Sequence, residues 1–319
     1  MGGATEAPGT FSVSTERISL STYIGLLDVG LTGRYYPSRT MDFLQKLRNA
    51  THSNRSLLCV GLDPDPELMP GVGILEFNHA IIDATSDLVC AYKPNLAFYE
   101  ASGVEGLRAL EKTIAHIPDN IPIIGDAKRG DIGSTARAYA RALFSTFGFD
   151  AATVNPYLGH DSVEPFIEYK DKGVFFVCHT SNPGSAQFQD LLLSLGSATT
   201  GKGEKPLFDV VAQRAREWNT FGNIGLVVGA TYSEELKRVR QLCPEIPLLI
   251  PGIGAQCGDL AGAVCYGVDV QGEKAIISSS RQIIYAYRER SEKGVDFAVS
   301  TRDAALELRD EINGYRGTT

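Results

Sequence analysis

The sequence predicts an α/β fold in which eight parallel strands close into a (β/α)8 barrel, or TIM barrel. Eight short apolar runs recur along the chain, and stretches long enough for a helix separate most of them. The first run is not followed by the glycine fingerprint of a dinucleotide-binding domain. The number eight and this missing fingerprint favour a closed barrel over a doubly wound open sheet, which remains the alternative.

The predicted strands share a short length, an apolar character and an enrichment in β-branched side chains. They cover residues 57–62, 88–92, 121–125, 151–155, 174–178, 224–228, 247–250 and 275–278. Between them, the clearest predicted helices cover residues 106–115, 135–147 and 233–242. Nearly every predicted strand ends on polar or turn-forming residues. In a barrel these ends meet at one rim, where enzymes of this architecture build their active sites.

The first 40 residues differ from the rest of the chain. They are rich in Gly, Ser and Thr and show no helical or strand periodicity, whereas Met41 opens an amphipathic run typical of a first helix. We interpret residues 1–40 as an N-terminal extension, either disordered or introduced by cloning. Residues 41–319 are then a single catalytic barrel domain.

Composition limits the classes of partner. The net charge of −8 and the pI of about 5.2 argue against binding to nucleic acid or to an anionic membrane surface. No apolar run approaches the roughly 20 residues of a membrane-spanning helix. Six cysteines contain no C-x-x-C pair, and five histidines show no metal-binding spacing. These patterns predict a cytoplasmic protein without a disulfide framework or a metal site.

A cluster of charges follows the third predicted strand, where residues 126–131 read D-A-K-R-G-D. If the strand continues, Asp126 and Lys128 lie on the same face, because side chains alternate along a strand. The simpler interpretation is a surface salt-bridge cluster. Lys93, however, ends the second predicted strand, so Lys93, Asp126, Lys128 and Asp131 together suggest an alternating array of charges. In such an array a lysine can protonate carbon, and a carboxylate can strain a bound anion.

Two further segments at strand ends predict how a substrate is held. The glycine-rich P-G-I-G segment at residues 251–254 and Arg281 follow the seventh and eighth strands, as in a barrel phosphate site. We assign Gln256 to the phosphate as well, rather than to a solvated loop. The long segment 181–206 after the fifth strand is predicted to be a lid.

These segments resemble those of orotidine 5′-monophosphate decarboxylases, from about residue 41 to residue 314. The D-x-K-x-x-D signature of that family stands at residues 126–131, its upstream lysine at Lys93 and its first-strand aspartate at Asp63. T-S-N-P at residues 180–183 and P-G-I-G-A-Q at residues 251–256 match one branch of the family. D-x-K-x-x-D alone is shared with sugar-phosphate decarboxylases, but the combination is specific.

The resemblance implies a carboxy-lyase of pyrimidine biosynthesis that converts orotidine 5′-monophosphate (OMP) to uridine 5′-monophosphate (UMP) and CO2 without metal or cofactor. It implies that Lys128 stabilises and protonates a carbanion at C6, while Asp126 crowds the departing carboxylate. Lys93 and Asp63 would contact the ribose, and Ser181 the pyrimidine. The implied substrate-binding residues are Asp63, Asn95, Ile132, Thr135, Thr180, Ser181, Pro251, Gly252, Gln256, Ser280 and Arg281.

The resemblance also implies a homodimer in which Asp131, Ile132 and Thr135 reach into the site of the neighbouring subunit. Two other functions remain open from the residues. One is a metal-assisted sugar-phosphate decarboxylase or synthase, in which Asp65 would be the additional acidic ligand. The other is a non-catalytic phosphate-binding barrel, which would have no need of the charge array.

Overall fold

The computed structural model describes residues 1–2, 41–194, 204–254, 258–289 and 296–316. The predicted extension, residues 1–40, therefore lies outside the described residues except for its first two. The fold described below belongs to the unit Met41–Thr319. No helix in the described ranges is both long and apolar enough to cross a membrane.

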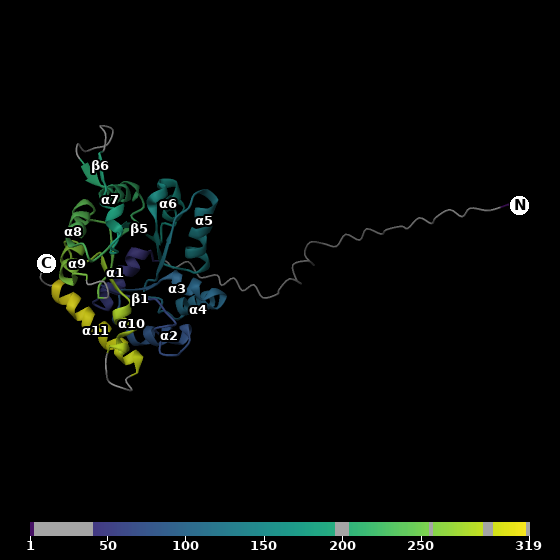
Figure 1. Ribbon diagram of the computed structural model, residues 1–319, viewed down its shortest axis with the longest axis horizontal. Helices are drawn as coiled ribbons and strands as arrows, with labels where there is room; N and C mark the ends of the chain where they lie inside the picture. Colours follow the sequence, from purple (N-terminus) through teal and green to yellow (C-terminus); the bar gives the residue numbers. More distant parts are fainter. Residues whose placement is uncertain (3–40, 195–203, 255–257, 290–295, 317–319) are drawn as a thin grey trace. The chain divides into compact units, whose positions relative to one another are not determined.

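Eight parallel strands form a nearly closed barrel, which confirms the predicted fold class (Figure 1). The strands are β1 (Leu58–Leu62), β2 (Ala91–Pro94), β3 (Ile124–Arg129), β4 (Ala151–Val154), β5 (Gly173–His179), β8 (Ile224–Val228), β9 (Leu248–Pro251) and β10 (Ala275–Ser279). Neighbours in this order pair with each other, and β10 pairs with β1. Between β2 and β3 the pairing is reduced to two isolated bridges, Tyr92 with Ile123 and Asn95 with Asp126.

The second and third strands begin three residues later than predicted and include charged residues. Apolarity suggested residues 88–92 and 121–125, but Leu88, Val89 and Ile121 precede the paired segments and are buried in the larger hydrophobic cluster. Backbone pairing with the neighbouring strand sets the actual bounds, and this pairing continues past the apolar run. Lys93, Asp126 and Lys128 therefore stand on strands rather than on loops.

Helices surround the strands, as Figure 1 shows. They are α1 (Phe43–Ser53), α2 (Ile74–Thr85), α3 (Leu96–Ala101), α4 (Gly103–His116), α5 (Gly133–Arg141), α6 (His160–Ile167), α7 (Leu207–Trp218), α8 (Ser233–Leu242), α9 (Leu260–Gly267), α10 (Arg281–Ile284) and α11 (Phe297–Arg316). The bounds of α8 are those predicted. The predicted helix 135–147 is instead α5, which starts at Gly133, followed by a π-helical turn at Ala142–Thr146.

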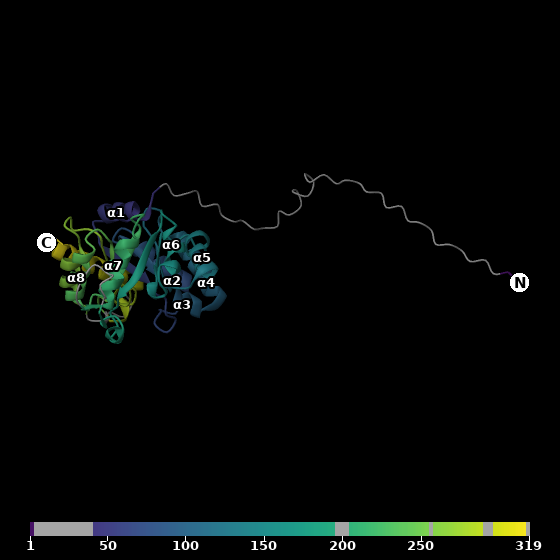
Figure 2. The same cartoon turned by 90° about the horizontal axis from the view of Figure 1, so that it is seen from above.

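Helix α1 closes one end of the barrel, as seen from the side in Figure 2. Phe43 packs edge-on against Phe175 of β5, with 5.7 Å between ring centroids. One turn further, the ammonium of Lys46 lies 2.7 Å from the carboxylate of Asp150, and both side chains are almost fully buried. Asp150 directly precedes β4, and Phe175 lies in the first half of β5, so α1 covers the amino ends of the strands and leaves their carboxyl ends for a site.

The segment after β5 contains more regular structure than the predicted lid. Ser185–Gln187 forms a 3-10 turn, and the short strands β6 (Leu192–Ser194) and β7 (Glu204–Pro206) pair as an antiparallel hairpin. Residues 195–203 between these strands lie outside the described residues. A lid function for this segment stays a prediction.

Candidate active site

A pocket of about 430 Å³ opens at the carboxyl ends of the barrel strands. Every strand of the barrel, or the loop directly after it, contributes at least one lining residue. The lining consists of Asp63, Lys93, Asn95, Asp126, Lys128, Thr153, Thr180, Ser181, Asn182, Val227, Leu249, Pro251, Gly252, Ile253, Ser278, Ser280 and Arg281. Among the described residues, all predicted site residues line it except Asp131, Ile132 and Thr135, while Gln256 lies outside the described residues.

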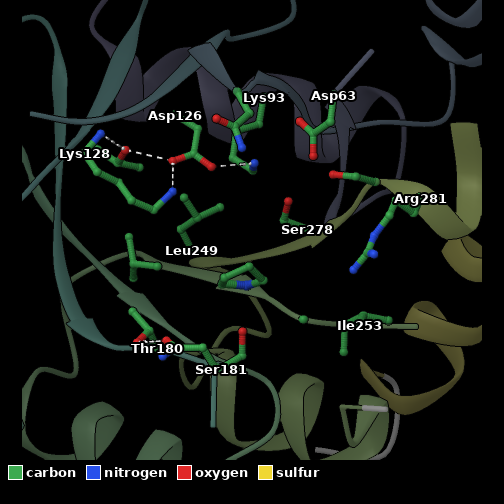
Figure 3. A pocket seen from close by; sticks show the side chains of 17 residues that line it. Asp63, Lys93, Asp126, Lys128, Thr180, Ser181, Leu249, Ile253, Ser278 and Arg281 are labelled. Carbon is green, nitrogen blue, oxygen red and sulfur yellow. Dashed lines mark hydrogen bonds and ion pairs between the residues drawn. The ribbon is translucent and has the colours of Figure 1, made fainter. Parts of the chain in front are cut away.

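Three of the four predicted array residues meet in one ion-paired group on the pocket wall (Figure 3). The carboxylate of Asp126 accepts hydrogen bonds from Lys93 Nζ at 2.9 Å and from Lys128 Nζ at 2.5 Å, one on each oxygen. The Lys93 and Asp126 side chains are almost fully buried, whereas the Lys128 side chain is 50% exposed. The Lys128 ammonium is therefore the member of the group most accessible to a ligand in the pocket.

The charges of this group stabilise each other against the cost of burial. Burial opposes ionisation of Asp126, but the ammonium groups of Lys93 and Lys128 outweigh it and hold the pKa of this carboxyl well below its usual range. Burial likewise opposes the charge of Lys93, but the carboxylates of Asp126 and Asp63 outweigh it and hold the Lys93 pKa above its usual value. The pair is thus charged throughout the physiological pH range.

This pairing predicts a pH-dependent cost of removing Asp126. A lowered carboxyl pKa stabilises the fold above about pH 4, and a raised ammonium pKa stabilises it below about pH 10. Between these limits the wild-type contribution of the pair is constant. Asp126→Asn leaves Lys93 buried without its main partner, so the free energy of unfolding should fall by about 3–5 kcal/mol at pH 7.

This deficit should shrink toward pH 9, because the unpaired Lys93 can then lose its proton in the folded state. Urea unfolding at pH 5, 7 and 9 measures both effects. Asp87→Asn is the matched control, since its ion pair with Arg302 is largely exposed and should be worth no more than about 1 kcal/mol. Equal and pH-independent costs for the two variants would refute the inferred coupling.

Lys128 reaches Asp126 by a different backbone path from the one predicted. Strand alternation was expected to place both side chains on one face, but the pairing of β3 with β4 shifts register between Gly125 and Arg129. Lys128 itself has a φ of +47°, in the left-handed region that side-chain-bearing residues rarely adopt. The regular strand on which that expectation depended is therefore interrupted here, and the two side chains meet across an irregular stretch of backbone.

The opposite end of the pocket has the character of an anion site. Gly252 has a φ of +103°, which only glycine adopts readily, and it lines the pocket with Pro251. Ser280 and the exposed Arg281 come from the end of β10 and the start of α10. Gln256, predicted to join them, lies outside the described residues.

The loop after β5 forms a third wall, with Thr180 and Ser181 facing the ion-paired group across the pocket (Figure 3), and Asn182 also lines the pocket. Gly229 of the next barrel loop makes room for it, since a Cβ there would stand 2.6 Å from the backbone nitrogen of Ser181. The N–H of Thr180 donates to the side chain of Gln189 at 2.8 Å. The predicted lid segment is therefore bonded directly to the pocket wall.

Six lining residues were not assigned to the site from the sequence. Asn182 and Ile253 were recognised only as parts of motifs, and Val227 and Leu249 read as ordinary apolar strand residues. Thr153 and Ser278 read as strand residues. The missed residues are Thr153, Asn182, Val227, Leu249, Ile253 and Ser278. Only their position near the ends of predicted barrel strands could have identified them.

The residues assigned to a neighbouring subunit do not line the pocket of their own chain. Asp131 precedes α5, and its carboxylate accepts the N–H of Ile132 at 2.7 Å. The Ile132 side chain is 55% exposed, and Thr135 is also exposed. Within one chain, the fourth member of the predicted array is therefore separate from the other three.

A comparison with known proteins gives consistent matches along the barrel. The profile of the orotidine 5′-phosphate decarboxylase / HUMPS family matches residues 56–293. The orotidine 5′-phosphate decarboxylase of Dehalococcoides mccartyi is 54% identical over 278 residues, which cover 86% of this chain and 99% of the relative. Its counterpart from Thermomicrobium roseum is 50% identical, covering 86% of this chain and 96% of the relative.

Solved structures agree with the sequence matches. The OMP decarboxylase of Leishmania donovani is 40% identical with a TM-score of 0.74, over 86% of this chain and 99% of that chain. The UMP synthase of Leishmania donovani is 41% identical with a TM-score of 0.76, over 87% of this chain but only 57% of that chain. This chain thus spans little more than half the length of that second protein.

Proposed function

Because the chain belongs to the orotidine 5′-phosphate decarboxylase / HUMPS family, we propose that it is the carboxy-lyase that converts OMP to UMP and CO2. The observation that supports this most directly is the ion-paired group Lys93–Asp126–Lys128 on the wall of the barrel pocket. A site that only binds phosphate does not need a buried carboxylate between two ammonium groups, because burying such charges is costly.

The proposed reaction uses Lys128 as both electrostatic stabiliser and acid. When the bond between C6 and the carboxylate breaks, the electron pair stays on C6, next to the Lys128 ammonium. Lys128 then transfers a proton to C6, and the neutral amine regains a proton from solvent. Where the bound nucleotide displaces water from the pocket, the attraction between ammonium and carbanion is stronger than in water.

Asp126 favours loss of the carboxylate by repelling it in the bound substrate. A substrate carboxylate beside Lys128 must also approach Asp126, whose oxygen lies 2.5 Å from the same ammonium. This repulsion disappears when the carboxylate leaves as neutral CO2, so it raises the ground state more than the transition state. The apolar side chains of Val227, Leu249 and Ile253 offer a wall of the pocket that suits an uncharged product.

The remaining pocket residues support binding of the nucleotide. Asp63 Oδ1 is buried and has no hydrogen-bond partner among the described residues, so it is available to accept a ribose hydroxyl. Lys93 can share this contact, and Ser181 can meet the pyrimidine edge. Asn95, Thr180, Pro251, Gly252 and Ser280 complete the proposed binding surface. Arg281 would bind the phosphate at the far end.

Arg281→Ala should lower kcat/KM by roughly 100-fold or more. A charged contact to phosphate is worth about 3 kcal/mol, and binding energy at the phosphate supports the chemistry at C6. Added guanidinium should restore part of the lost activity. The matched control is Arg288→Ala, because Arg288 is exposed, its guanidinium donates to the carbonyl of Leu68, and it does not line the pocket. An unchanged kcat/KM in Arg281→Ala would remove Arg281 from the phosphate site.

The proposed activity is tested by the loss of OMP absorbance in a buffer that contains EDTA. Sustained turnover supports a metal-independent decarboxylase. Activity that disappears with EDTA and returns with Mg²⁺ would favour the metal-assisted alternative, and binding of OMP without turnover would favour the non-catalytic one. The structure gives the metal-assisted alternative little support, because Asp65 does not line the pocket and its carboxylate accepts the N–H of Glu67.

We also propose that the enzyme works as a cytoplasmic homodimer in which Asp131, Ile132 and Thr135 complete the site of the other subunit. Besides the exposed Ile132, three large apolar or aromatic side chains are exposed on α5 or on the turn after β4. These are Tyr139, Tyr157 and Leu158, of which Tyr157 is 77% exposed. Helices α5 and α6 pack side by side (Figure 1). Exposed apolar residues gathered on one side indicate a protein interface.

A further inference from the structure

Thr153 lies directly behind the bend that carries Lys128. It stands on β4, and its side chain is almost fully buried at the pocket wall. Its hydroxyl oxygen accepts the N–H of Ala127 at 3.0 Å and the N–H of Lys128 at 2.9 Å. The same hydroxyl donates its hydrogen to Asp126 Oδ1 at 3.0 Å. Because a hydroxyl has one donor and two acceptor sites, all its hydrogen-bonding capacity is used.

These three bonds compensate for an irregular backbone. The register of β3 against β4 is interrupted between Gly125 and Arg129, which is where Ala127 and Lys128 lie. Regular strand pairing is therefore replaced here by bonds to a side chain. Lys128 holds a left-handed conformation that costs about 1–3 kcal/mol for a residue with a side chain. Such a conformation persists only where the surrounding bonds fix it.

The bonds also converge on the carboxylate oxygen that orients the lysine. Asp126 Oδ1 receives the Thr153 hydroxyl and the Lys128 ammonium, while Oδ2 receives Lys93. The two N–H groups occupy the acceptor sites of the hydroxyl, so its hydrogen is directed at Asp126. One side chain thus fixes both the backbone of Lys128 and the partner of its ammonium.

We propose that Thr153 is a positioning residue for the decarboxylation, acting through Asp126 and Lys128 rather than on the substrate. Its hydroxyl holds Lys128 in the left-handed conformation that directs the ammonium toward Asp126 and the pocket. The inference rests on the proposed function. It predicts that the hydroxyl of Thr153 determines the rate at C6 and not the affinity for the rest of the nucleotide.

The test compares Thr153→Val, which keeps the shape but removes the hydroxyl, with Thr153→Ser, which keeps the hydroxyl. Thr85→Val is the matched control, because the Thr85 hydroxyl is also buried and bonds to Ile81 and Tyr92, away from the pocket. We expect kcat of Thr153→Val to fall about 100-fold, as for a small displacement of a catalytic group. Thr153→Ser should keep most of the wild-type kcat. Thr85→Val should have a lower melting temperature and an unchanged kcat.

The affinities of two ligands distinguish a displaced Lys128 from a general disruption of the pocket. UMP lacks a group at C6, so its dissociation constant should change less than about threefold in Thr153→Val, since none of its contacts is removed. 6-Hydroxyuridine 5′-monophosphate places an anionic oxygen beside Lys128, so its affinity should fall in step with kcat. A crystal structure of Thr153→Val should show Lys128 outside the left-handed region.

Several outcomes would overturn the inference. Wild-type kcat in Thr153→Val would do so, as would an equal loss in Thr153→Ser or a parallel loss of UMP affinity. If Thr153→Val does not fold, Thr153→Cys replaces it, with kcat expected below that of Thr153→Ser at equal melting temperature, because a thiol is a weak hydrogen-bonding group. A wild-type protein without OMP turnover would refute the proposed function itself, which is a separate result.

Discussion

Replacing Lys128 by alanine should lower turnover by at least about 10⁴-fold, because the substitution removes both the charge that stabilises the carbanion and the proton that quenches it. The melting temperature should change little, since the Lys128 side chain is 50% exposed and its stem fills no core. Affinity for inorganic phosphate should also stay near wild type, because Arg281 lies at the other end of the pocket (Figure 3).

The measurements are kcat from the loss of OMP absorbance, thermal unfolding, and phosphate binding. Lys237→Ala serves as the control, because Lys237 is also about half exposed and its ammonium contacts Glu234 and the ring of Tyr266, away from the pocket. It should match wild type in every assay. If Lys128→Ala kept more than a few per cent of wild-type kcat, the role assigned to Lys128 would be wrong.

A mixture of two inactive variants should regain activity if the site is shared between subunits. Suppose that Lys128 acts in the site of its own subunit and Asp131 in the site of the other. In a dimer formed from one Lys128→Ala and one Asp131→Ala subunit, one site then carries both changes and the other carries none. Refolding equal amounts together should give half mixed dimers by random pairing, and so about a quarter of wild-type activity by the two-fold symmetry of the dimer.

Lys128→Ala mixed with Asp126→Asn provides the control. Both residues belong to the same ion-paired group of one chain, so every site in that mixture still carries one change. This mixture should stay inactive. If mixed dimers of Lys128→Ala and Asp131→Ala form but remain as inactive as the separate variants, the shared site is excluded.

The barrel could be predicted because each of its strands is marked by a pattern within a few consecutive residues. Each strand is a short apolar run, and a polar residue marks the end at which the chain reaches the rim. Lys93 and Asp126 could be placed in one site for that reason. The bounds of β2 were less predictable, since they depend on pairing with β1 rather than on the apolarity of residues 88–92.

The parts that could not be predicted depend on contacts between distant segments. Thr153 looks like any β-branched strand residue, and only the tertiary structure shows its hydroxyl meeting the backbone 25 and 26 positions earlier. The left-handed conformation of Lys128 has no sequence signature, because glycine and asparagine are the residues that usually mark it. Likewise, nothing in the sequence indicated that Gln189 bonds to the N–H of Thr180.

The closure of the barrel by α1 has a consequence for the order of events during synthesis. The buried pair of Lys46 and Asp150 at the bottom of the barrel can form only after Asp150 has been added, 104 residues after Lys46. At synthesis rates of 5–20 residues per second this delay is about 5–20 s. During that time the apolar face of α1, with Phe43 and Leu47, lacks the five later strands, β4, β5, β8, β9 and β10, that complete its buried cluster. Helix α1 of a newly made chain is thus only partly covered until these later strands have emerged from the ribosome.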